Sequence, residues 1–133
     1  MADPVQVVRA MYDAFARGDA EAALDVFDPD VDWDGRNFPD GVQGRGRQAV
    51  IDHTLNWASV WKDWTVELEE LTQVSPETVI TYIRERGRSE AGVVMDERHA
   101  ELYVVRDDRI IRRIGFSDPA EAVPAARDLG LLD

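Results

Sequence analysis

The chain has 133 residues, with 27 acidic against 15 basic side chains and a formal net charge of −12 at pH 7. Such an acidic chain repels phosphate backbones and anionic lipids, so neither nucleic acid nor a membrane is an expected partner. The absence of cysteine excludes disulfides, thiolate nucleophiles and cysteine-based metal sites. No signal-peptide pattern and no bilayer-length apolar run are visible, so we expect a cytoplasmic protein.

The first third of the chain is expected to be mainly helical. Apolar side chains recur at spacings of three and four over residues 5–16, and Asp3 is a suitable N-cap for this helix. Asp19 is expected to cap a second helix that runs through Phe27. The next elements are a short alternating strand over 31–34, a glycine-rich loop over 35–46 and a third helix over about 47–61.

The apolar period then changes from 3.6 to 2, which predicts strands over 64–74, 78–86, 95–105 and 109–116. A slip in the alternation between Leu68 and Leu71 indicates a bulge. A short helix is expected between Asp118 and about Arg127. No repeat or linker divides the chain, so residues 1–133 are predicted to form one α+β domain. A curved antiparallel sheet packed on three N-terminal helices would make a cone with an internal cavity.

Local strings along most of the chain carry a family resemblance. They are FARGD (15–19), FDPDVDW (27–33), GRGRQAV (44–50), WKDW (61–64) and VVRDDRIIR (104–112). Their order and spacing resemble the SnoaL-like polyketide-cyclase family of the nuclear transport factor 2 superfamily. That superfamily includes isomerases, epoxide hydrolases, cyclases, dehydratases and non-enzymatic binding domains, so the resemblance implies the fold rather than the activity. It also implies a homodimer through the outer face of the sheet, which would otherwise be exposed.

Three polar side chains share one face of the predicted strand 95–105. His99, Glu101 and Tyr103 alternate there, while the apolar residues 100, 102 and 104 point to the other face. Hydrophobicity alone would bury the apolar face, whereas the resemblance turns Glu101 into the cavity. Both faces would be covered if the helices packed on one and a second subunit on the other.

The resemblance places Glu101 where ketosteroid isomerases carry a protonated aspartic acid in the oxyanion hole. A carboxyl group in an apolar cavity has a raised pKa and can act as a general acid. The alternative is an ion pair across the sheet, for example with Arg113. Glu85, in the string 84–88, is expected at a solvated strand end with cross-strand ion pairs.

A second candidate histidine lies on the predicted third helix. His53 is followed by Trp57 and Trp61 at i+4 and i+8, so the three side chains form one stripe along that helix. A histidine ring in the cavity could titrate near neutral pH. The alternative is a hydrogen-bonded, inert histidine at the rim.

Departures from known active sites argue against two specific enzymes. Gly35 stands at the position of the ketosteroid isomerase base, with Asp34 one step away, and Met11 stands at the position of its helical tyrosine, with Tyr12 one step away. One step along a strand turns a side chain to the opposite face. The epoxide hydrolase triad of this superfamily also lacks its last acid, because Gly115 lies in that region.

We therefore predict a small-molecule cavity protein whose ligand is a small apolar carbonyl compound. Acid/base chemistry of the isomerase or cyclase type, or of the hydrolase or lyase type, would need no cofactor and no metal, and Glu101 with His99 or His53 would perform it. The residues expected to bind the substrate are Trp33, Trp57, Tyr103, Tyr12, Phe116 and Arg113. The alternative function is a non-catalytic ligand-binding or dimerisation domain.

Overall fold

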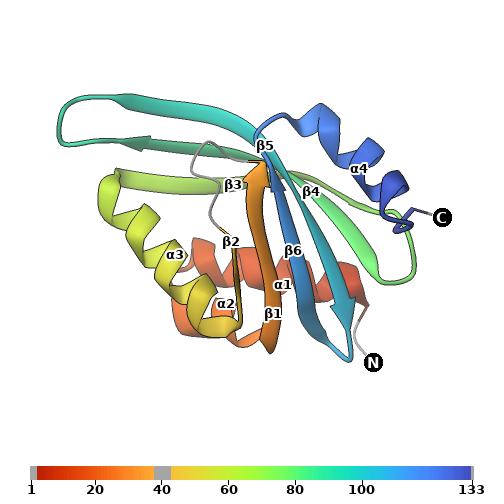
Figure 1. Cartoon of the computed structure of the whole chain (residues 1–133). Helices are drawn as coiled ribbons and strands as arrows, with labels where there is room; N and C mark the ends of the chain where they lie inside the picture. The colour runs from red at the N-terminus through yellow and green to blue at the C-terminus, as the bar shows by residue number, and fades with distance from the viewer. Residues whose placement is uncertain (1–2, 38–42, 133) are drawn as a thin grey trace.

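The computed structural model describes residues 3–37 and 43–132. In chain order the elements are α1 (Pro4–Ala16), α2 (Ala20–Asp25), β1 (Phe27–Asn37), β2 (Gln43–Arg45), α3 (Arg47–Val60), β3 (Lys62–Gln73), β4 (Thr78–Arg88), β5 (Val94–Arg106), β6 (Arg109–Phe116), a 3-10 turn (Pro119–Glu121) and α4 (Ala122–Asp128). Helices α1, α2 and α3 lie on one side of a curved sheet, and α4 lies on the other (Figure 1). No helix within the described residues is long and apolar enough to cross a membrane.

The six strands form one sheet in the order β2-β1-β6-β5-β4-β3. All neighbouring strands are antiparallel except β1 and β6, which pair in parallel. The predicted α+β architecture is confirmed. The predicted bulge in β3 is also present, as a shift in the pairing with β4 between Leu68 and Glu70.

The start of α1 follows the sequence signals. The Asp3 side chain accepts a hydrogen bond of 2.9 Å from the backbone N–H of Val5, and Pro4 occupies the first turn. Capping satisfies an N–H group that has no partner within the helix. Apolar side chains of α1, including Val8 and Met11, then pack in the core.

The sequence prediction was wrong around the first strand. Phe27 begins β1 instead of continuing the second helix, because it pairs with Ile110 of β6 and Ile110 donates a backbone hydrogen bond of 2.8 Å to Val26. The predicted glycine-rich loop contains strand β2, which pairs with β1; positions 38–42 of that loop lie outside the described residues. Pairing with distant strands overrides the local turn signals here.

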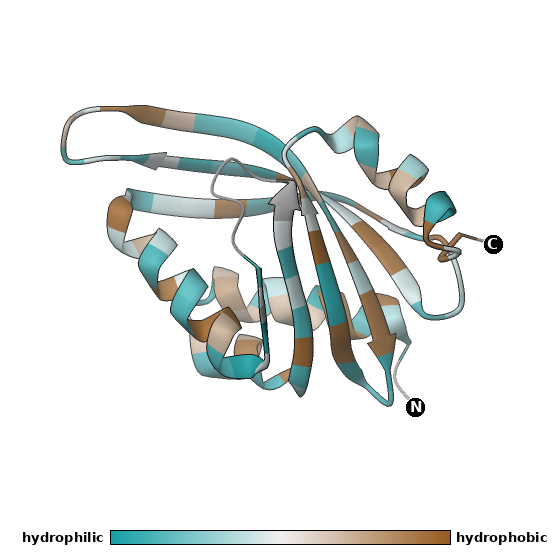
Figure 2. Cartoon of the chain, viewed as in Figure 1, coloured by the Kyte–Doolittle hydropathy of each residue, from teal (hydrophilic) through white to brown (hydrophobic). Residues whose placement is uncertain are grey.

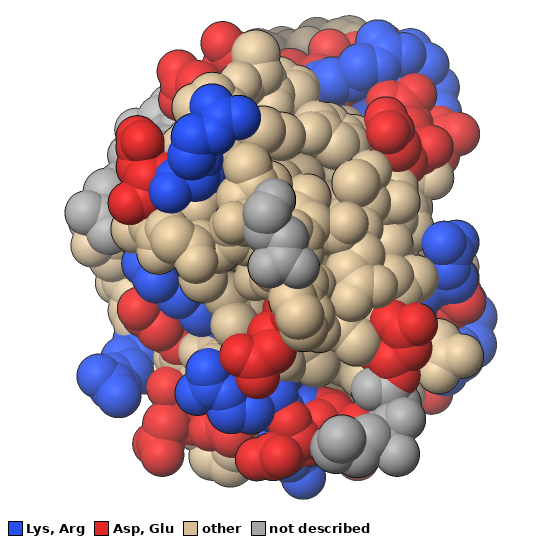
Figure 3. Space-filling model, turned by 90° about the vertical axis from the view of Figure 1, so that its right-hand side faces the viewer, with Lys and Arg blue, Asp and Glu red and all other residues tan. Residues whose placement is uncertain are grey.

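Each face of the central strands contributes to its own core. Hydrophobic and hydrophilic residues alternate along these strands (Figure 2). On one face Tyr103 and Val105 pack with α1, whereas on the other Ala100 and Leu102 pack with α4 through Ala122. The second face thus packs against the chain's own C-terminal helix. On the side of the molecule that carries α4, the Lys, Arg, Asp and Glu side chains lie mainly around the edge of the view (Figure 3).

Candidate functional site

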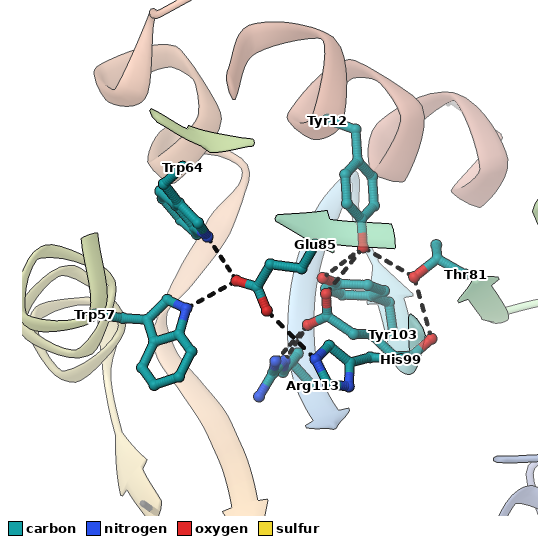
Figure 4. A network of polar contacts seen from close by, with 9 residues as sticks. Tyr12, Trp57, Trp64, Thr81, Glu85, His99, Tyr103 and Arg113 are labelled. Atoms are coloured by element: carbon teal, nitrogen blue, oxygen red, sulfur yellow. Dashed lines mark hydrogen bonds and ion pairs between the residues drawn. The ribbon is translucent and has the colours of Figure 1, made fainter. Parts of the chain in front are cut away.

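A cavity of about 760 Å³ lies between the inner face of the sheet and helices α1 and α3. Its walls are largely aromatic and apolar. All four tryptophans of the chain line it: Trp33, Trp57, Trp61 and Trp64. A cavity of this size with few polar groups is typical of a small-molecule site. Two clusters of polar groups lie in it, one around Glu101 and one around Glu85. Figure 4 shows Tyr12 and Arg113 of the first cluster and Glu85 of the second.

The first cluster surrounds the carboxylate of Glu101. Arg113 Nε donates a hydrogen bond of 2.6 Å to Glu101 Oε2, and the Tyr12 hydroxyl donates one of 3.1 Å to Oε1. The same hydroxyl lies 2.8 Å from Thr81 Oγ1 and 3.2 Å from the Tyr103 hydroxyl. Glu101 and Arg113 are only 7% and 6% exposed. Of the two interpretations left open by the sequence, the ion pair with Arg113 is therefore the one present.

The surroundings of this cluster fix the charge states of its other members. Burial, followed by the charge of Glu101, raises the pKa of both the Tyr12 and Tyr103 hydroxyls, so both keep their protons near neutral pH. Burial lowers the pKa of Arg113, but the charge and hydrogen bond of Glu101, together with the two tyrosine hydroxyls, outweigh burial, and the net direction is upward. The Arg113 guanidinium also lies 4.0 Å from the centre of the Trp33 ring, a cation–π contact.

The second cluster surrounds the carboxylate of Glu85, which is 8% exposed. The indole N–H groups of Trp57 and Trp64 donate hydrogen bonds of 2.8 and 2.6 Å to Glu85 Oε2. His99 Nε2 lies 3.4 Å from Glu85 Oε1 and 3.3 Å from Glu97 Oε2. One imidazole therefore stands between a buried carboxylate and a solvent-exposed one.

The imidazole and the buried carboxylate shift each other's titration. Burial lowers the pKa of His99, but its carboxylate neighbours outweigh burial and bring the pKa above 6.5. The upward contributions come from the hydrogen bond and charge of Glu85, a hydrogen bond with the Ser117 backbone and the charge of Glu97. Burial raises the pKa of Glu85, but hydrogen bonds from His99, Trp64 and Trp57 bring it below 4.5. These shifts favour an imidazolium–carboxylate pair.

The structure brings most of the predicted site residues to the cavity. Strand β5 turns His99, Glu101 and Tyr103 inward, and the cavity is also lined by Trp33, Trp57, Tyr12, Arg113 and His53. The ring of His53 lies across the cavity on α3, 5.5 Å from the Trp33 ring. Asp34, the residue after Trp33, is buried but does not line the cavity.

Phe116 is a correction to the predicted site. It pairs with Ala100 on the outer face of the sheet and packs in the core beneath α4, at 2% exposure. The alternation along β6 explains its position, because Arg113 points into the cavity and Phe116 lies three residues further on.

The sequence did not predict Glu85 and Trp64, which form one of the polar contacts in the cavity, as site residues. The expectation of a solvated strand end was wrong for Glu85, which is buried. Thr81, Ile83 and Glu85 share one face of β4 and stand opposite residues 101, 99 and 97 of β5. This register places Glu85 on the same wall as Glu101, and the shared face of 81, 83 and 85 was the available sequence signal.

The family model of the SnoaL-like domain matches residues 8–113. The chain belongs to the SnoaL-like family. This SnoaL-like chain is 36% identical over 120 residues to an uncharacterised protein of Mycobacterium tuberculosis, covering 87% of this chain and 90% of the relative.

Two solved structures illustrate the fold of the SnoaL-like chain. A nuclear transport factor 2-like protein from Burkholderia thailandensis has a TM-score of 0.80 at 24% identity, covering 94% of this chain and 98% of that one. A Mycobacterium tuberculosis protein in complex with estradiol-17β-hemisuccinate has a TM-score of 0.72 at 20% identity, covering 86% of this chain and 94% of that one. At these identities the likeness shows the fold alone.

Proposed function

We propose that this SnoaL-like protein binds a small, apolar carbonyl compound and catalyses cofactor-independent proton transfer beside its carbonyl group. The observation that carries the proposal is that His99 and Glu101 lie two residues apart on the cavity face of β5. His99 is favoured as a cation, and Glu101 is held in an ion pair with Arg113. Two residues along a strand span about 6.6 Å. A carbonyl oxygen and the neighbouring carbon of one ligand can fit between groups at that spacing, each within hydrogen-bond reach.

The roles follow from the contacts of each group. The His99 Nε2–H faces Glu85 Oε1 at 3.4 Å and Glu97 Oε2 at 3.3 Å. His99 shares this single N–H between Glu85 and the carbonyl oxygen, which takes the place of the exposed Glu97 carboxylate. The Glu101 carboxylate removes a proton from the carbon next to the carbonyl, leaving an enolate on the ligand. Return of that proton to a different carbon completes an isomerisation, and attack of the enolate on a second carbonyl closes a ring before reprotonation. Arg113 and Tyr12 hold Glu101 in place through their hydrogen bonds.

The aromatic lining supports an apolar ligand, because indole and phenol rings offer large apolar surfaces. The structural neighbour in complex with estradiol-17β-hemisuccinate supports the same ligand class.

The test is proton exchange on a panel of small ketones in D2O, followed by loss of the proton NMR signals beside the carbonyl. The wild type is expected to exchange at least one ketone, and Glu101→Gln or His99→Gln to lower that rate by about 10²- to 10⁴-fold. Glu69→Gln is the matched control, because Glu69 is exposed and pairs with Arg98 outside the cavity. An exchange rate that Glu101→Gln leaves unchanged would refute the assignment.

A non-catalytic ligand-binding domain is the second candidate. It is favoured by the contacts of Glu85, whose carboxylate is already satisfied by Trp57, Trp64 and His99 without a ligand. A ligand that co-purifies with the protein and stays unmodified over days would support this function, whereas multiple turnovers of the same ligand would exclude it.

We propose in addition that two copies pair through the side of the molecule that carries α4. Partly buried apolar side chains gather there around the second core, including Val74, Ile111, Val123, Leu131 and Leu132. The charged side chains on that side lie mainly around the edge of the view (Figure 3). Surfaces of this kind in soluble proteins commonly mark interfaces.

A further inference from the structure

The apolar lining of the cavity continues to the tip of the β4–β5 hairpin. Val93 and Val94 line the cavity together with Met95, yet they are 58% and 73% exposed. Hydrophobic residues lie near the end of this hairpin on its β5 side (Figure 2). The cavity thus extends from the polar clusters to two exposed valines at the turn, in a chain that is otherwise strongly acidic.

The tip is an ordered turn. Ser89 N–H donates 2.9 Å to the Val93 carbonyl, Val93 N–H donates 3.1 Å to Ser89 Oγ, and Gly92 N–H donates 3.0 Å to the Ser89 carbonyl. Next to the turn, Gly87 packs so closely on Trp61 that an added Cβ would lie 2.9 Å from the Trp61 Cβ. The two valines are therefore held in a defined position beside the cavity.

The distance from the reactive end to the tip sets the length of a ligand that could reach both. Five residues of β5 separate His99 from Val94, which at the strand rise is about 16 Å. The cavity wall along this path carries Glu85 and Glu97 as well as the valines. A neutral apolar chain suits this path better than an anionic one.

We infer that the natural ligand is a carbonyl compound with a long, uncharged apolar tail, and that this tail runs along β5 and covers Val93 and Val94. The inference rests on the proposed function for the carbonyl end only. Burial of the two valines by the tail would remove apolar surface from water on both partners, which stabilises the complex.

The test measures the dissociation constants of methyl ketones from six to fourteen carbons by quenching of tryptophan fluorescence, which reports on the cavity because all four tryptophans line it. In the wild type, affinity is expected to rise by about fourfold per added methylene up to the longest chains. In the double variant Val93→Ser/Val94→Ser, six-carbon ketones should bind as in the wild type, and twelve- to fourteen-carbon ketones should bind about tenfold more weakly.

Val60→Ser is the matched control, because Val60 is also an exposed valine, 50% exposed, but does not line the cavity. It should leave every dissociation constant unchanged. The inference is overturned if affinity stops rising at short chains, if the double variant weakens short and long ketones equally, or if Val60→Ser has the same effect. Proton exchange on the six-carbon ketone is measured separately, so a failure of the catalytic proposal is distinguishable from a failure of the tail proposal.

Discussion

The buried ion pair between Glu101 and Arg113 allows a quantitative prediction. Arg113→Met removes the guanidinium but keeps most of the apolar stem. It leaves the Glu101 carboxylate at 7% exposure without a charged partner, with the Tyr12 hydroxyl still donating at 3.1 Å. Breaking a buried pair from one side destabilises by about 3–5 kcal/mol. Loss of the cation–π contact with Trp33 adds about 0.5–2 kcal/mol. The sum is a large share of the roughly 5–15 kcal/mol that stabilises a typical domain.

The assay is urea unfolding at pH 7 followed by tryptophan fluorescence. The variant Arg113→Met/Glu101→Leu, which removes both charges, should recover most of the loss, because two apolar side chains need no compensation. Arg98→Met is the control: its guanidinium pairs with Glu69 but is 60% exposed, so its loss should change the free energy of unfolding by less than about 1 kcal/mol. If Arg113→Met were as mild as Arg98→Met, the Glu101 carboxylate would be solvated through the cavity and the reasoning about its burial would be wrong.

Three further predictions concern titration, the indole contacts and assembly. An NMR titration should place the pKa of His99 above 6.5 and show it lowered by Glu85→Gln; no change in the variant would contradict the pairing. Folding raises the pKa of His99, so its contribution to the free energy of unfolding is full below pH 6.5 and is lost as pH rises through the folded pKa. The contribution of Glu85 to the same free energy is present above pH 4.5 and is lost as pH falls. His99→Gln should therefore destabilise the fold more at pH 6 than at pH 9. Trp57→Phe and Trp64→Phe each remove a hydrogen-bond donor from the buried Glu85 carboxylate. Each should lower the free energy of unfolding by about 1–3 kcal/mol more than Trp61→Phe, because the Trp61 indole N–H has no hydrogen-bond partner among the described residues. Equal losses in the three variants would contradict a stabilising role of these two hydrogen bonds. Light scattering is expected to give twice the chain mass of 15.0 kDa, and a value near 15.0 kDa would exclude the dimer.

Regular periodicity made most of the fold predictable from the sequence. The cap at Asp3 and the alternation along β5 depend only on neighbouring residues, so both could be read directly. The parallel pairing of β1 with β6 joins residues as far apart as Phe27 and Ile110, and no local signal contains it. The covering of the outer sheet face was equally non-local, because it depends on where α4 packs.

The candidate site shows the same division. Glu101, His99 and Tyr12 could be proposed from alternation and resemblance, and all three line the cavity. For Glu85 the arginines on both sides of it predicted a solvated segment, and they outweighed the signal from the face that it shares with Thr81 and Ile83. Its burial is decided by indole groups on α3 and β3, which the folded chain brings to it from more than twenty residues away.

The two faces of β5 have a consequence for how the protein can fail. His99 and Glu101 alternate with Ala100 and Leu102, which belong to the core beneath α4. A slip of one residue in the pairing of β5 would turn the charged pair into that core and the apolar residues into the cavity. A slip of one residue therefore cannot keep the hydrophobic interior while losing the site. The pairing of β5 that buries the apolar residues is also the pairing that turns His99 and Glu101 into the cavity. Stable folding of this strand and assembly of the site are therefore the same process.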